Sequence, residues 1–452
     1  MKKPKPFFLS LALISILIIE GCSTVTVKQE KNFVSVKGTH FMLGGKPYYF
    51  VGTNMWYGAY LGSPGNTGDR ERLKRELNDL VASGITNIRV CAASEESLMD
   101  RAIKPAFQKS PGVYDNDLLD GLDYLLAEMG KRNMHAVLFL NNYWQWTGGM
   151  AQYNAWFKDN KIPDPDDPKI GYGKFMDYSA EFYLNEKAKE CFDSYVRMLA
   201  TRVNKYTGIP YIDDPTIMAW QLANEPRPGR NLDVIKTADV FYKWIDDSAK
   251  LIHFLDPNHL VTTGSEGLAG TLQSEEIFLK AHESKYIDYA TMHLWPKNWG
   301  WFDATKIDET YPRTEKNAVE YINEHLAYAR KLNKPITMEE FGIPRDFEQY
   351  KPGTPTTARD KYFKKIFEIV YDSAAAGAPI AGTNFWAWGG TARNPNADAK
   401  WREGDQYFGD PPQEPQGLNS IYDTDLSTLE IIKSHSDKMK ALSEKGNSIN
   451  TK

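Results

Sequence analysis

The sequence predicts an α/β fold, a (β/α)8 TIM barrel that occupies residues 33–445 as one domain. Eight short β-rich runs alternate with eight segments whose apolar residues recur at helical spacing, which is the pattern of a barrel of parallel strands. Several connections that follow strands are long, as expected for βα loops at the C-terminal rim of a barrel. A doubly wound open sheet is the alternative, but it rarely needs so many regular units.

The eight predicted strands are mostly apolar runs bounded by residues that favour turns. They cover residues 47–54, 86–90, 135–141, 216–222, 259–264, 287–293, 334–340 and 379–386. A segment ahead of the first strand, residues 33–46, alternates apolar and polar residues around a Gly-Gly pair. We expect this segment to form a β-hairpin that plugs the floor of the barrel.

The eight predicted helices show apolar residues at helical spacing, and several end in Gly or Asn, which commonly follow the last helical turn. They cover residues 69–84, 115–133, 186–206, 233–255, 272–283, 316–333, 358–377 and 427–444, of which 272–283 has the weakest pattern. Each predicted helix follows a predicted strand, so the alternation is complete.

Three long connections, residues 142–184, 294–313 and 387–427, follow strands and contain many aromatic residues. The whole chain is 13% aromatic, with 12 Trp and 25 Tyr. Rings exposed in a cleft bind flat apolar faces, and sugar rings are one such ligand. We therefore expect these loops to form the walls of an aromatic-lined groove, while packing of the same rings into the core stays open as the alternative.

The N-terminus has the pattern of an export signal rather than of a folded segment. "MKKPKP" supplies positive charge, and "FFLSLALISILII" has the length of a signal-peptide apolar region. Residues 1–21 are the predicted signal peptide, and Cys22 follows in a bacterial lipobox in which Glu20 is an unusual residue. We expect Cys22 to be lipidated and residues 22–32 to form a tether. The protein would then be exported and held at a membrane, which could be the inner or the outer one. At the other end of the chain, residues 446–452 are expected to form a short tail.

Charge and cysteine content exclude several other classes of function. The formal net charge is −5 with acids and bases interspersed, and the absence of a basic stripe argues against a nucleic-acid partner. Cys91 and Cys191 form neither a disulfide framework nor a metal-ligand spacing and are predicted to be small buried hydrophobes. The acidic run 164–168 lacks the Gly and the final Glu of a calcium loop. We expect a monomer that needs no metal and no organic cofactor.

Polar residues stand where the predicted strands end, and in a barrel these positions converge on the axis. Glu225 follows the strand 216–222, and Glu340 ends the strand 334–340. One Glu at a strand end would more often be solvated or salt-bridged, but two facing each other in a polar cleft predict glycoside hydrolysis. One carboxyl then acts protonated and the other ionised, and Arg89 is the candidate that favours the ionised form.

Several motifs carry a resemblance to a known family. "NIRV", "ANEP", "EEFG" and "FWAW" look like glycoside hydrolase family 5 of clan A, and "VGTNMWYGAYLG", "NNYWQWTGGMAQYNAW", "HLWPKNW" and "EPQGLNSIYDTD" resemble its bacterial and fungal endo-β-1,4-mannanases. The resemblance runs from about Phe33 to Lys440. It implies a retaining mechanism with Glu225 as acid/base and Glu340 as nucleophile.

The same resemblance implies roles for residues around this pair. Asn224 matches the Asn that binds the sugar 2-hydroxyl, and Arg89 matches the Arg that orients the nucleophile. His293 matches the His of the sixth strand, and Trp386 matches the Trp at the floor of the −1 subsite. Trp295 stands where the family often has a Tyr that is hydrogen-bonded to the nucleophile, and an indole N–H can also donate.

Other residues near the predicted rim have weaker signals. Trp56 and Asn142 are predicted to contact substrate, and Trp144, Trp146, Trp299 and Trp388 are candidates for either sugar contact or packing. Alternation along a strand sends Glu339 to the side opposite Glu340, so we expect it either to have a structural role or to support the residues that contact substrate. Glu266 is predicted to stabilise a loop.

The expected function is therefore retaining hydrolysis of β-1,4-mannosidic bonds in mannan, glucomannan or galactomannan by an endo-β-mannanase. An exo-acting β-mannosidase or mannobiohydrolase, in which loops block one end of the groove, and an endo-β-1,4-glucanase are alternatives within the family. A non-catalytic glycan-binding surface lipoprotein is the alternative of another class, and the carboxylate pair argues against it.

Overall fold

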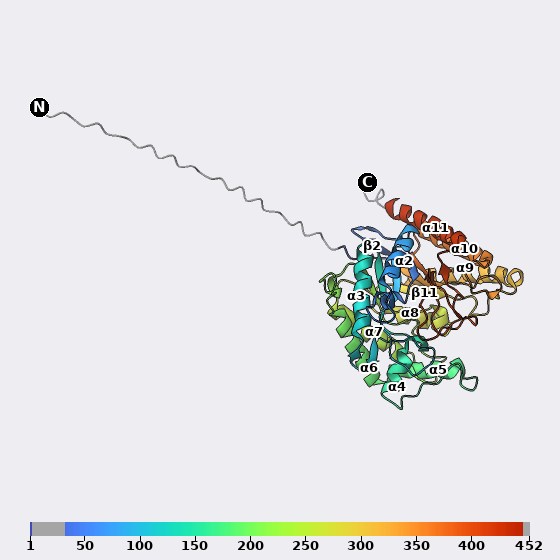
Figure 1. Ribbon diagram of the computed structural model, residues 1–452, viewed down its shortest axis with the longest axis horizontal. Helices are drawn as coiled ribbons and strands as arrows, with labels where there is room; N and C mark the ends of the chain where they lie inside the picture. The colour runs from blue at the N-terminus through green and yellow to red at the C-terminus, as the bar shows by residue number, and fades with distance from the viewer. Residues whose placement is uncertain (2–31, 446–452) are drawn as a thin grey trace. The chain divides into compact units, whose positions relative to one another are not determined.

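The computed structural model describes residue 1 and residues 32–445 (Figure 1). The chain divides into two units, Met1–Lys31 and Asn32–Lys452, and the description below concerns the second. The predicted signal peptide, Cys22 and nearly all of the predicted tether lie outside the described residues, as does the 446–452 tail. Among the helices of the described part, none is both long and apolar enough to cross a membrane.

A barrel of eight parallel strands forms the centre of the fold. The strands are β4 (Phe50–Asn54), β5 (Asn87–Cys91), β8 (His135–Phe139), β9 (Ile217–Gln221), β10 (Leu260–Thr262), β11 (Ala290–Leu294), β12 (Ile336–Phe341) and β13 (Ile380–Phe385). Their order in the sheet is β10-β9-β8-β5-β4-β13-β12-β11. Its two edges meet where Thr262 bridges Tyr289, whose carbonyl accepts from Thr262 Oγ1 at 2.8 Å. The predicted (β/α)8 barrel is confirmed, and a strand lies in each predicted strand segment.

Eight long helices follow these strands around the barrel. They are α2 (Arg70–Ala82), α3 (Asn116–Gly130), α6 (Glu186–Ala200), α7 (Asp239–Leu255), α8 (Glu275–Glu283), α9 (Ile307–Leu332), α10 (Thr357–Ala375) and α11 (Leu426–Lys445). Side chains of Asp69, Asp115, Asn185 and Ser274 accept backbone N–H groups at the starts of α2, α3, α6 and α8. These caps satisfy donors that a helix start leaves without an intrahelical partner.

Helix α9 begins earlier than its sequence pattern predicts. The predicted helix starts at residue 316, yet α9 starts at Ile307 and includes Pro312, which has no backbone N–H to donate. Thr314 Oγ1 donates to the Trp301 carbonyl at 2.9 Å, and the Tyr311 side chain is buried. Contacts with the preceding loop therefore hold the early turns that proline weakens.

A small antiparallel sheet closes the floor of the barrel. It has three strands, β1 (Ser35–Lys37), β2 (His40–Leu43) and β3 (Lys46–Pro47), one more than the predicted hairpin. Phe41 of β2 packs edge-on against Tyr289 with ring centroids 5.1 Å apart. Together with Val34 it belongs to a buried cluster that draws residues from five barrel strands. This cluster separates the floor from the opposite rim, where the polar strand ends lie.

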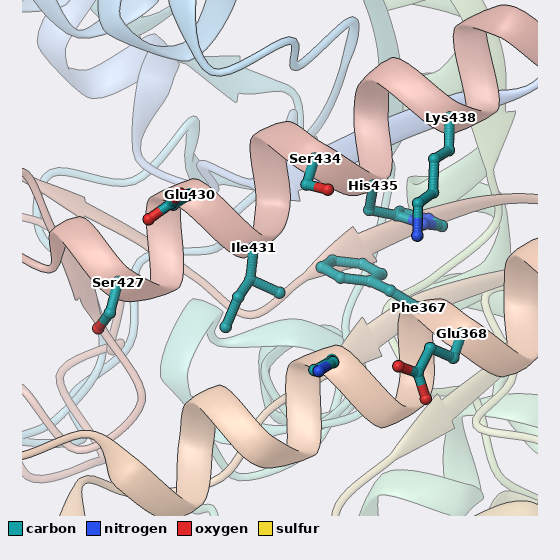
Figure 2. Close-up of a pocket in the computed structure, with 9 residues that line it drawn as sticks. Phe367, Glu368, Ser427, Glu430, Ile431, Ser434, His435 and Lys438 are labelled. Carbon is teal, nitrogen blue, oxygen red and sulfur yellow. The ribbon is translucent and has the colours of Figure 1, made fainter.

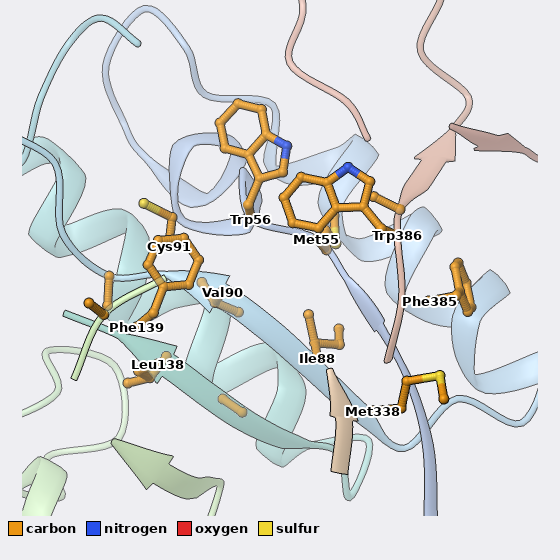
Figure 3. Close-up of a cluster of buried hydrophobic side chains, with 14 of the residues drawn as sticks. Met55, Trp56, Ile88, Val90, Cys91, Leu138, Phe139, Met338, Phe385 and Trp386 are labelled. Carbon is orange, nitrogen blue, oxygen red and sulfur yellow. The ribbon is translucent and has the colours of Figure 1, made fainter. Parts of the chain in front are cut away.

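Alternation along the strands produces two layers of side chains. Outward-facing residues such as Ile88, Val90 and Leu138 belong to the large apolar core between sheet and helices (Figure 3). In the interior, Asn384 Nδ2 of β13 donates to Asn87 Oδ1 of β5 at 2.9 Å, across the intervening strand β4. A Cβ added to Gly52 would lie 2.2 Å from Asn384 Nδ2, so only glycine fits there. The barrel interior is therefore partly polar, so that charged groups near the rim are not surrounded by apolar side chains alone.

The connections between the barrel strands and the helices that follow, and those between helices and strands, contain further elements that the sequence pattern did not predict. These are α1 (Gly58–Gly62), β6 (Gln108–Ser110), β7 (Val113–Tyr114), α4 (Gly149–Trp156), α5 (Gly171–Ala180), β14 (Trp388–Gly390) and β15 (Ile421–Tyr422), with five short 3-10 turns. β14 pairs with β15 within the predicted 387–427 connection, which fixes both ends of that loop. The loop can thus present its middle part rigidly to the rim.

A groove of about 430 Å³ lies between α10 and α11 (Figure 2). Phe367 of α10 stacks on His435 of α11 with ring centroids 4.1 Å apart. All the residues that line it come from these two helices and none from the rim loops. It is therefore separate from the site described next.

Candidate active site

Two buried carboxyl groups meet at the rim of the barrel. Glu225 follows β9 and is 6% exposed, and Glu340 lies on β12 and is 2% exposed. His293 of β11 stands between them, with Nδ1 2.7 Å from Glu225 Oε1 and 3.2 Å from Glu340 Oε2. One oxygen of each carboxyl and a ring nitrogen of His293 all lie within 4.8 Å of one another. The imidazole of His293 therefore links the two carboxyl groups, because its Nδ1 contacts an oxygen of each.

The backbone at Glu225 has an unusual conformation that turns its side chain toward the rim. Its φ is +53°, in the left-handed region that non-glycine residues rarely adopt, at a cost of about 1–3 kcal/mol. The Glu225 N–H donates to the Gly264 carbonyl at 3.0 Å, and the Asn224 N–H donates to the Asn141 carbonyl at 2.8 Å. Neighbouring strands thus hold the turn beyond the end of β9, and Pro226, which has no N–H, cannot extend the ladder further.

Donors surround the Glu340 carboxylate. Arg89 Nη1 forms a short ion pair with Oε1, and Trp295 Nε1 donates to Oε2 at 3.1 Å. The Arg89 guanidinium is fully buried and also donates to Asn224 Oδ1 at 2.6 Å and Gln221 Oε1 at 2.8 Å. A buried arginine with this many acceptors is fixed in place, so Glu340 is presented as an oriented, ionised carboxylate.

Glu225 has a different environment. Trp144 Nε1 donates to Oε2 at 2.5 Å, and the Arg227 guanidinium lies 4.9 Å from the Trp144 ring centroid. Burial raises the pKa of Glu225, but the hydrogen bond and charge of His293, then Arg227 and Trp144, lower it overall. Burial lowers the pKa of His293, yet Glu340, Glu225 and Glu339 together hold it well above its ordinary value. Both directions favour a carboxylate on Glu225 hydrogen-bonded at 2.7 Å to a protonated His293, so the proton that Glu225 needs as an acid belongs to the pair.

Glu266 lies beside this pair and is paired with Arg227. Arg227 Nη2 forms a short ion pair with Glu266 Oε2, as expected for a carboxylate that stabilises its loop. Burial raises the pKa of Glu266 to about 7, against the lowering effect of Arg227. Both residues also line the cavity, which the sequence pattern did not indicate.

Glu339 does not lie on the side that strand alternation predicts. Met292 pairs with Met338 but His293 pairs with Glu340, so Glu339 is an extra residue in β12, a β-bulge. Its side chain is buried in the barrel interior, where Gln221 Nε2 donates to Oε2 and Tyr289 OH donates to Oε1 at 3.4 Å. The bulge lets two consecutive glutamates approach the same interior, which simple alternation forbids.

A cavity of about 600 Å³ opens above the carboxyl pair. Five indole rings line it, those of Trp144, Trp146, Trp295, Trp299 and Trp386. Trp295 and Trp386 pack edge to face with ring centroids 5.9 Å apart. Asn224, Glu225 and Glu340 form its polar base. Such a mixture of flat apolar faces and polar groups suits a pyranose ring, which has both surfaces.

Two residues predicted to contact substrate do not line this cavity. Trp56 is fully buried, and its Nε1 donates to the Gly409 carbonyl at 2.9 Å. Its ring packs edge to face against that of Trp146, with ring centroids 5.4 Å apart. Asn142 is also fully buried, and its Oδ1 accepts from the Trp144 N–H at 3.0 Å and from Asn224 Nδ2 at 3.1 Å. Neither side chain reaches the cavity in this structure, because other segments cover both strand ends, in the case of Trp56 the segment around Gly409.

The 387–427 connection adds groups that the sequence pattern did not identify. Gln413 and Glu414 line the cavity, and each has one buried side-chain oxygen without a hydrogen-bond partner in the described part of the chain. Burial raises the pKa of Glu414 to about 8, with the negative charges of Asp410, Glu340 and Glu225 acting in the same direction. Glu414 opens the motif "EPQGLNSIYDTD", but the motif gave it no role at the cavity, since the loop reaches the cavity only through folding.

The carboxyl pair and His293 are the one group of described residues whose atoms converge as metal ligands would. Here N–H donors of Arg89 and Trp295 occupy Glu340, and the N–H of Trp144 occupies Glu225. N–H groups cannot coordinate a cation. The arrangement is therefore that of a hydrogen-bonded acid–base cluster.

Comparison with known proteins agrees with this geometry. A family model described as GH family 5 beta-mannosidase-like matches residues 31–444. Mannan endo-1,4-beta-mannosidase 4 of Solanum lycopersicum is 29% identical over 388 residues, which are 83% of this chain and 89% of that protein. Mannan endo-1,4-beta-mannosidase 3 of Arabidopsis thaliana is 29% identical over 83% of this chain and 87% of its own length.

Solved structures show the same likeness. A glycoside hydrolase family 5 mannosidase from Rhizomucor miehei is 34% identical, with a TM-score of 0.84, over 91% of this chain and 99% of that one. A mutant of that mannosidase has been solved in complex with mannosyl-fructose. An endo-1,4-beta-mannanase from the same organism is 24% identical, with a TM-score of 0.66, over 90% and 99% of the two chains, which is a likeness of fold.

Proposed function

The chain belongs to glycoside hydrolase family 5, in its β-mannosidase-like group, and we propose that it is a retaining endo-β-mannanase. Its substrates are the β-1,4-mannosidic bonds of mannan, glucomannan or galactomannan, which the names of its curated relatives support. The observation that carries the proposal is the closeness of Glu225 and Glu340, with one oxygen of each within 4.8 Å. Retaining enzymes place their carboxyls about 5–5.5 Å apart, and inverting enzymes about 6.5–9.5 Å.

The two carboxyls divide the chemistry between them. Glu340 attacks the anomeric carbon while Glu225 gives its proton to the departing glycosidic oxygen, which breaks that bond and leaves a glycosyl ester on Glu340. Glu225, now ionised, takes a proton from water, and the hydroxide oxygen displaces Glu340 from the anomeric carbon. Two inversions retain the β configuration, and Glu225 regains its proton.

Neighbouring residues assist both steps. Arg89 and Trp295 orient Glu340 and stabilise its negative charge when it leaves in the second step. Asn224, held by Arg89 at 2.6 Å, is placed to bind the 2-hydroxyl of the sugar. Trp386 offers its ring as the floor under the reacting sugar, and His293 shares the proton that Glu225 delivers. No metal or organic cofactor enters this scheme.

An exo-acting β-mannosidase is the second candidate, favoured by one specific observation. The 387–427 loop contributes five residues to the lining of the cavity, which are Pro411, Gln413, Glu414, Pro415 and Leu418. One side-chain oxygen of Glu414 has no hydrogen-bond partner in the described part of the chain. The description of the matching family and the Rhizomucor miehei mannosidase support this candidate. A walled end would leave room for one terminal sugar only.

The products of hydrolysis decide between these candidates. An endo-acting enzyme lowers the viscosity of mannan at once and releases oligosaccharides of mixed length. An exo-acting enzyme releases mannose or mannobiose stepwise from the non-reducing end and barely changes viscosity at early times. Preference for cellulose over mannan would instead indicate the endo-β-1,4-glucanase. Failure to release reducing sugar from any β-glycan would contradict enzymatic function and favour the non-catalytic glycan-binding lipoprotein.

We also propose that the mature chain starts at a lipid-modified Cys22 and is exported as a monomer tethered to a membrane. The support is the basic and apolar pattern of residues 1–21 and the position of Cys22 behind it. A lipid-modified protein partitions into detergent after expression of the whole chain in a bacterium. A Cys22→Ala variant that stays in that fraction would contradict lipidation.

A further inference from the structure

Three buried carboxyl groups and two basic groups occupy the interior of the barrel next to the cavity. The carboxyls are Glu225, Glu339 and Glu340, and the basic groups are Arg89 and His293. The double-displacement scheme uses four of these five residues and leaves Glu339 without a role. A buried carboxylate is costly unless it is paired and hydrogen-bonded, so its presence calls for a physical reason.

The contacts of Glu339 show what it acts on. Gln221 and Tyr289 donate to its two oxygens, which satisfies a carboxylate rather than a neutral acid. Oε2 lies 3.7 Å from Arg89 Nε and 4.0 Å from His293 Nε2. Glu339 therefore lies within charge-interaction distance of both basic groups without forming a hydrogen bond to either of them.

The two nitrogens of His293 have different neighbours. Nδ1 contacts Glu225 and Glu340, whereas Nε2 is buried, has no hydrogen-bond partner in the described part of the chain and has Glu339 as its nearby carboxylate. A proton on the Glu225–His293 pair puts positive charge on this ring for part of the time. Among the described residues, Glu339 is the carboxylate that balances this charge on the Nε2 side, whereas Glu340 faces Nδ1 and its charge is already paired with that of Arg89.

We propose that Glu339 is a positioning residue for hydrolysis, because its buried carboxylate holds the proton that Glu225 and His293 share. The proposal rests on the proposed function, since that proton is the one that Glu225 delivers to the leaving group. Glu339 touches neither the cavity nor the reacting atoms and acts through His293. The β-bulge is the structural device that turns it into the barrel interior.

Replacing the carboxylate with a neutral group of the same shape tests this. In Glu339→Gln, loss of a negative charge favours the deprotonated form of every neighbouring group, so both limbs of the pH dependence of kcat/KM move to lower pH. A charge at this distance shifts such a limb by about one pH unit or more. The other charges that face the pair, those of Arg227, Glu266 and Glu414, are the same in both proteins.

Two further variants separate charge from structure. Glu339→Asp keeps the negative charge but moves it away from His293. The limbs of the pH dependence of kcat/KM should therefore move in the same direction as in Glu339→Gln, but by less. Tyr289→Phe removes a hydrogen bond to Glu339 without a change of charge, so its limbs stay where they are in the wild type, whatever happens to kcat. Thermal unfolding shows which variants fold. If Glu339→Gln does not fold, a shift of the kcat/KM limbs to lower pH in Glu339→Asp supports the proposal, and no shift or a shift to higher pH contradicts it.

A spectroscopic measurement on His293 gives a readout that does not depend on turnover. Its imidazole nitrogens, assigned by NMR in the whole protein, should lose the shared proton at lower pH in Glu339→Gln than in the wild type. A folded Glu339→Gln variant with unmoved limbs and an unchanged His293 titration would overturn the proposal. A wild-type protein that hydrolyses no β-mannoside would instead overturn the proposed function, so the two failures are distinguishable.

Discussion

The indole nitrogen of Trp295 lies 3.1 Å from Oε2 of Glu340 and donates its N–H to that carboxylate. Trp144 does the same for Glu225, with Nε1 2.5 Å from Oε2. Each carboxyl thus has one indole donor, and the difference between them comes from the second partner. Glu340 is paired with the permanent charge of Arg89, whereas Glu225 is paired with His293, which can lose its proton. This difference assigns the ionised role to Glu340 and the proton-carrying role to Glu225.

Removing the Trp295 donor should slow hydrolysis without unfolding the protein. A hydrogen bond to a charged group contributes about 1.5–3 kcal/mol, so Trp295→Phe should lower kcat/KM by about 10- to 100-fold. Steady-state kinetics on manno-oligosaccharides measures this. Trp295→Tyr restores a donor on an aromatic ring and should recover part of the loss, and a Phe variant as active as the wild type would show that the bond is unimportant.

Removing the Trp144 donor should change the pH dependence instead. Its N–H stabilises the ionised form of Glu225, so Trp144→Phe raises the pKa of Glu225, which then keeps its proton to higher pH. The alkaline limb of kcat/KM should move upward. Trp295→Phe is the matched control, since its indole contacts the other carboxyl, and a downward shift in Trp144→Phe would refute the assignment of Glu225 as the acid.

The stereochemistry of Glu225→Ala tests the double displacement. Loss of the general acid should slow the cleavage of mannan by about 10²- to 10⁴-fold, while aryl β-mannosides with good leaving groups still form the glycosyl ester. Azide should then displace Glu340 without needing a base. NMR of the product should show β-mannosyl azide, whereas the α anomer would indicate a single displacement.

Glu95 should make stability depend on pH. Its Oε2 accepts the Gly149 N–H at 2.8 Å, and burial raises its pKa to about 8. Because the folded-state pKa is above the unfolded-state value of about 4.3, the unfolded state releases the proton first and stability falls as pH rises between these values. Thermal unfolding should show a smaller loss of Tm between about pH 5 and about pH 8 in Glu95→Gln than in the wild type. Parallel losses in the two proteins would contradict this.

The fold and the position of the carboxyl pair followed from local patterns. The alternation of apolar runs with helical spacing predicted every barrel strand, because burial on both faces of a parallel strand leaves a continuous apolar run. Strand ends in a barrel share one rim, so Glu225 and Glu340 could be placed together before any contact was known. The same reasoning about strand ends placed four further residues near the carboxyl pair, which are Arg89, Asn224, His293 and Trp386.

Predictions failed where a residue's surroundings depend on loops that are distant in sequence. Trp56 was expected at the substrate, but the strand end that carries it is covered by the segment around Gly409. The place of Glu414 at the cavity was missed, because its motif lies in a long loop whose path no periodicity shows. The start of α9 was missed because contacts of Thr314 with Trp301 outweigh the local effect of Pro312.

By itself, the sequence determined the order of strands and helices, the two carboxyls at strand ends and the aromatic loops around them, since each depends on residues that are close in the chain. Only the tertiary structure decided how charge is distributed at the site. His293 bridges Glu225 and Glu340, and a bulge turns Glu339 toward His293. These relations join separate strands across the barrel, and Coulomb interactions depend on that distance rather than on the separation in sequence.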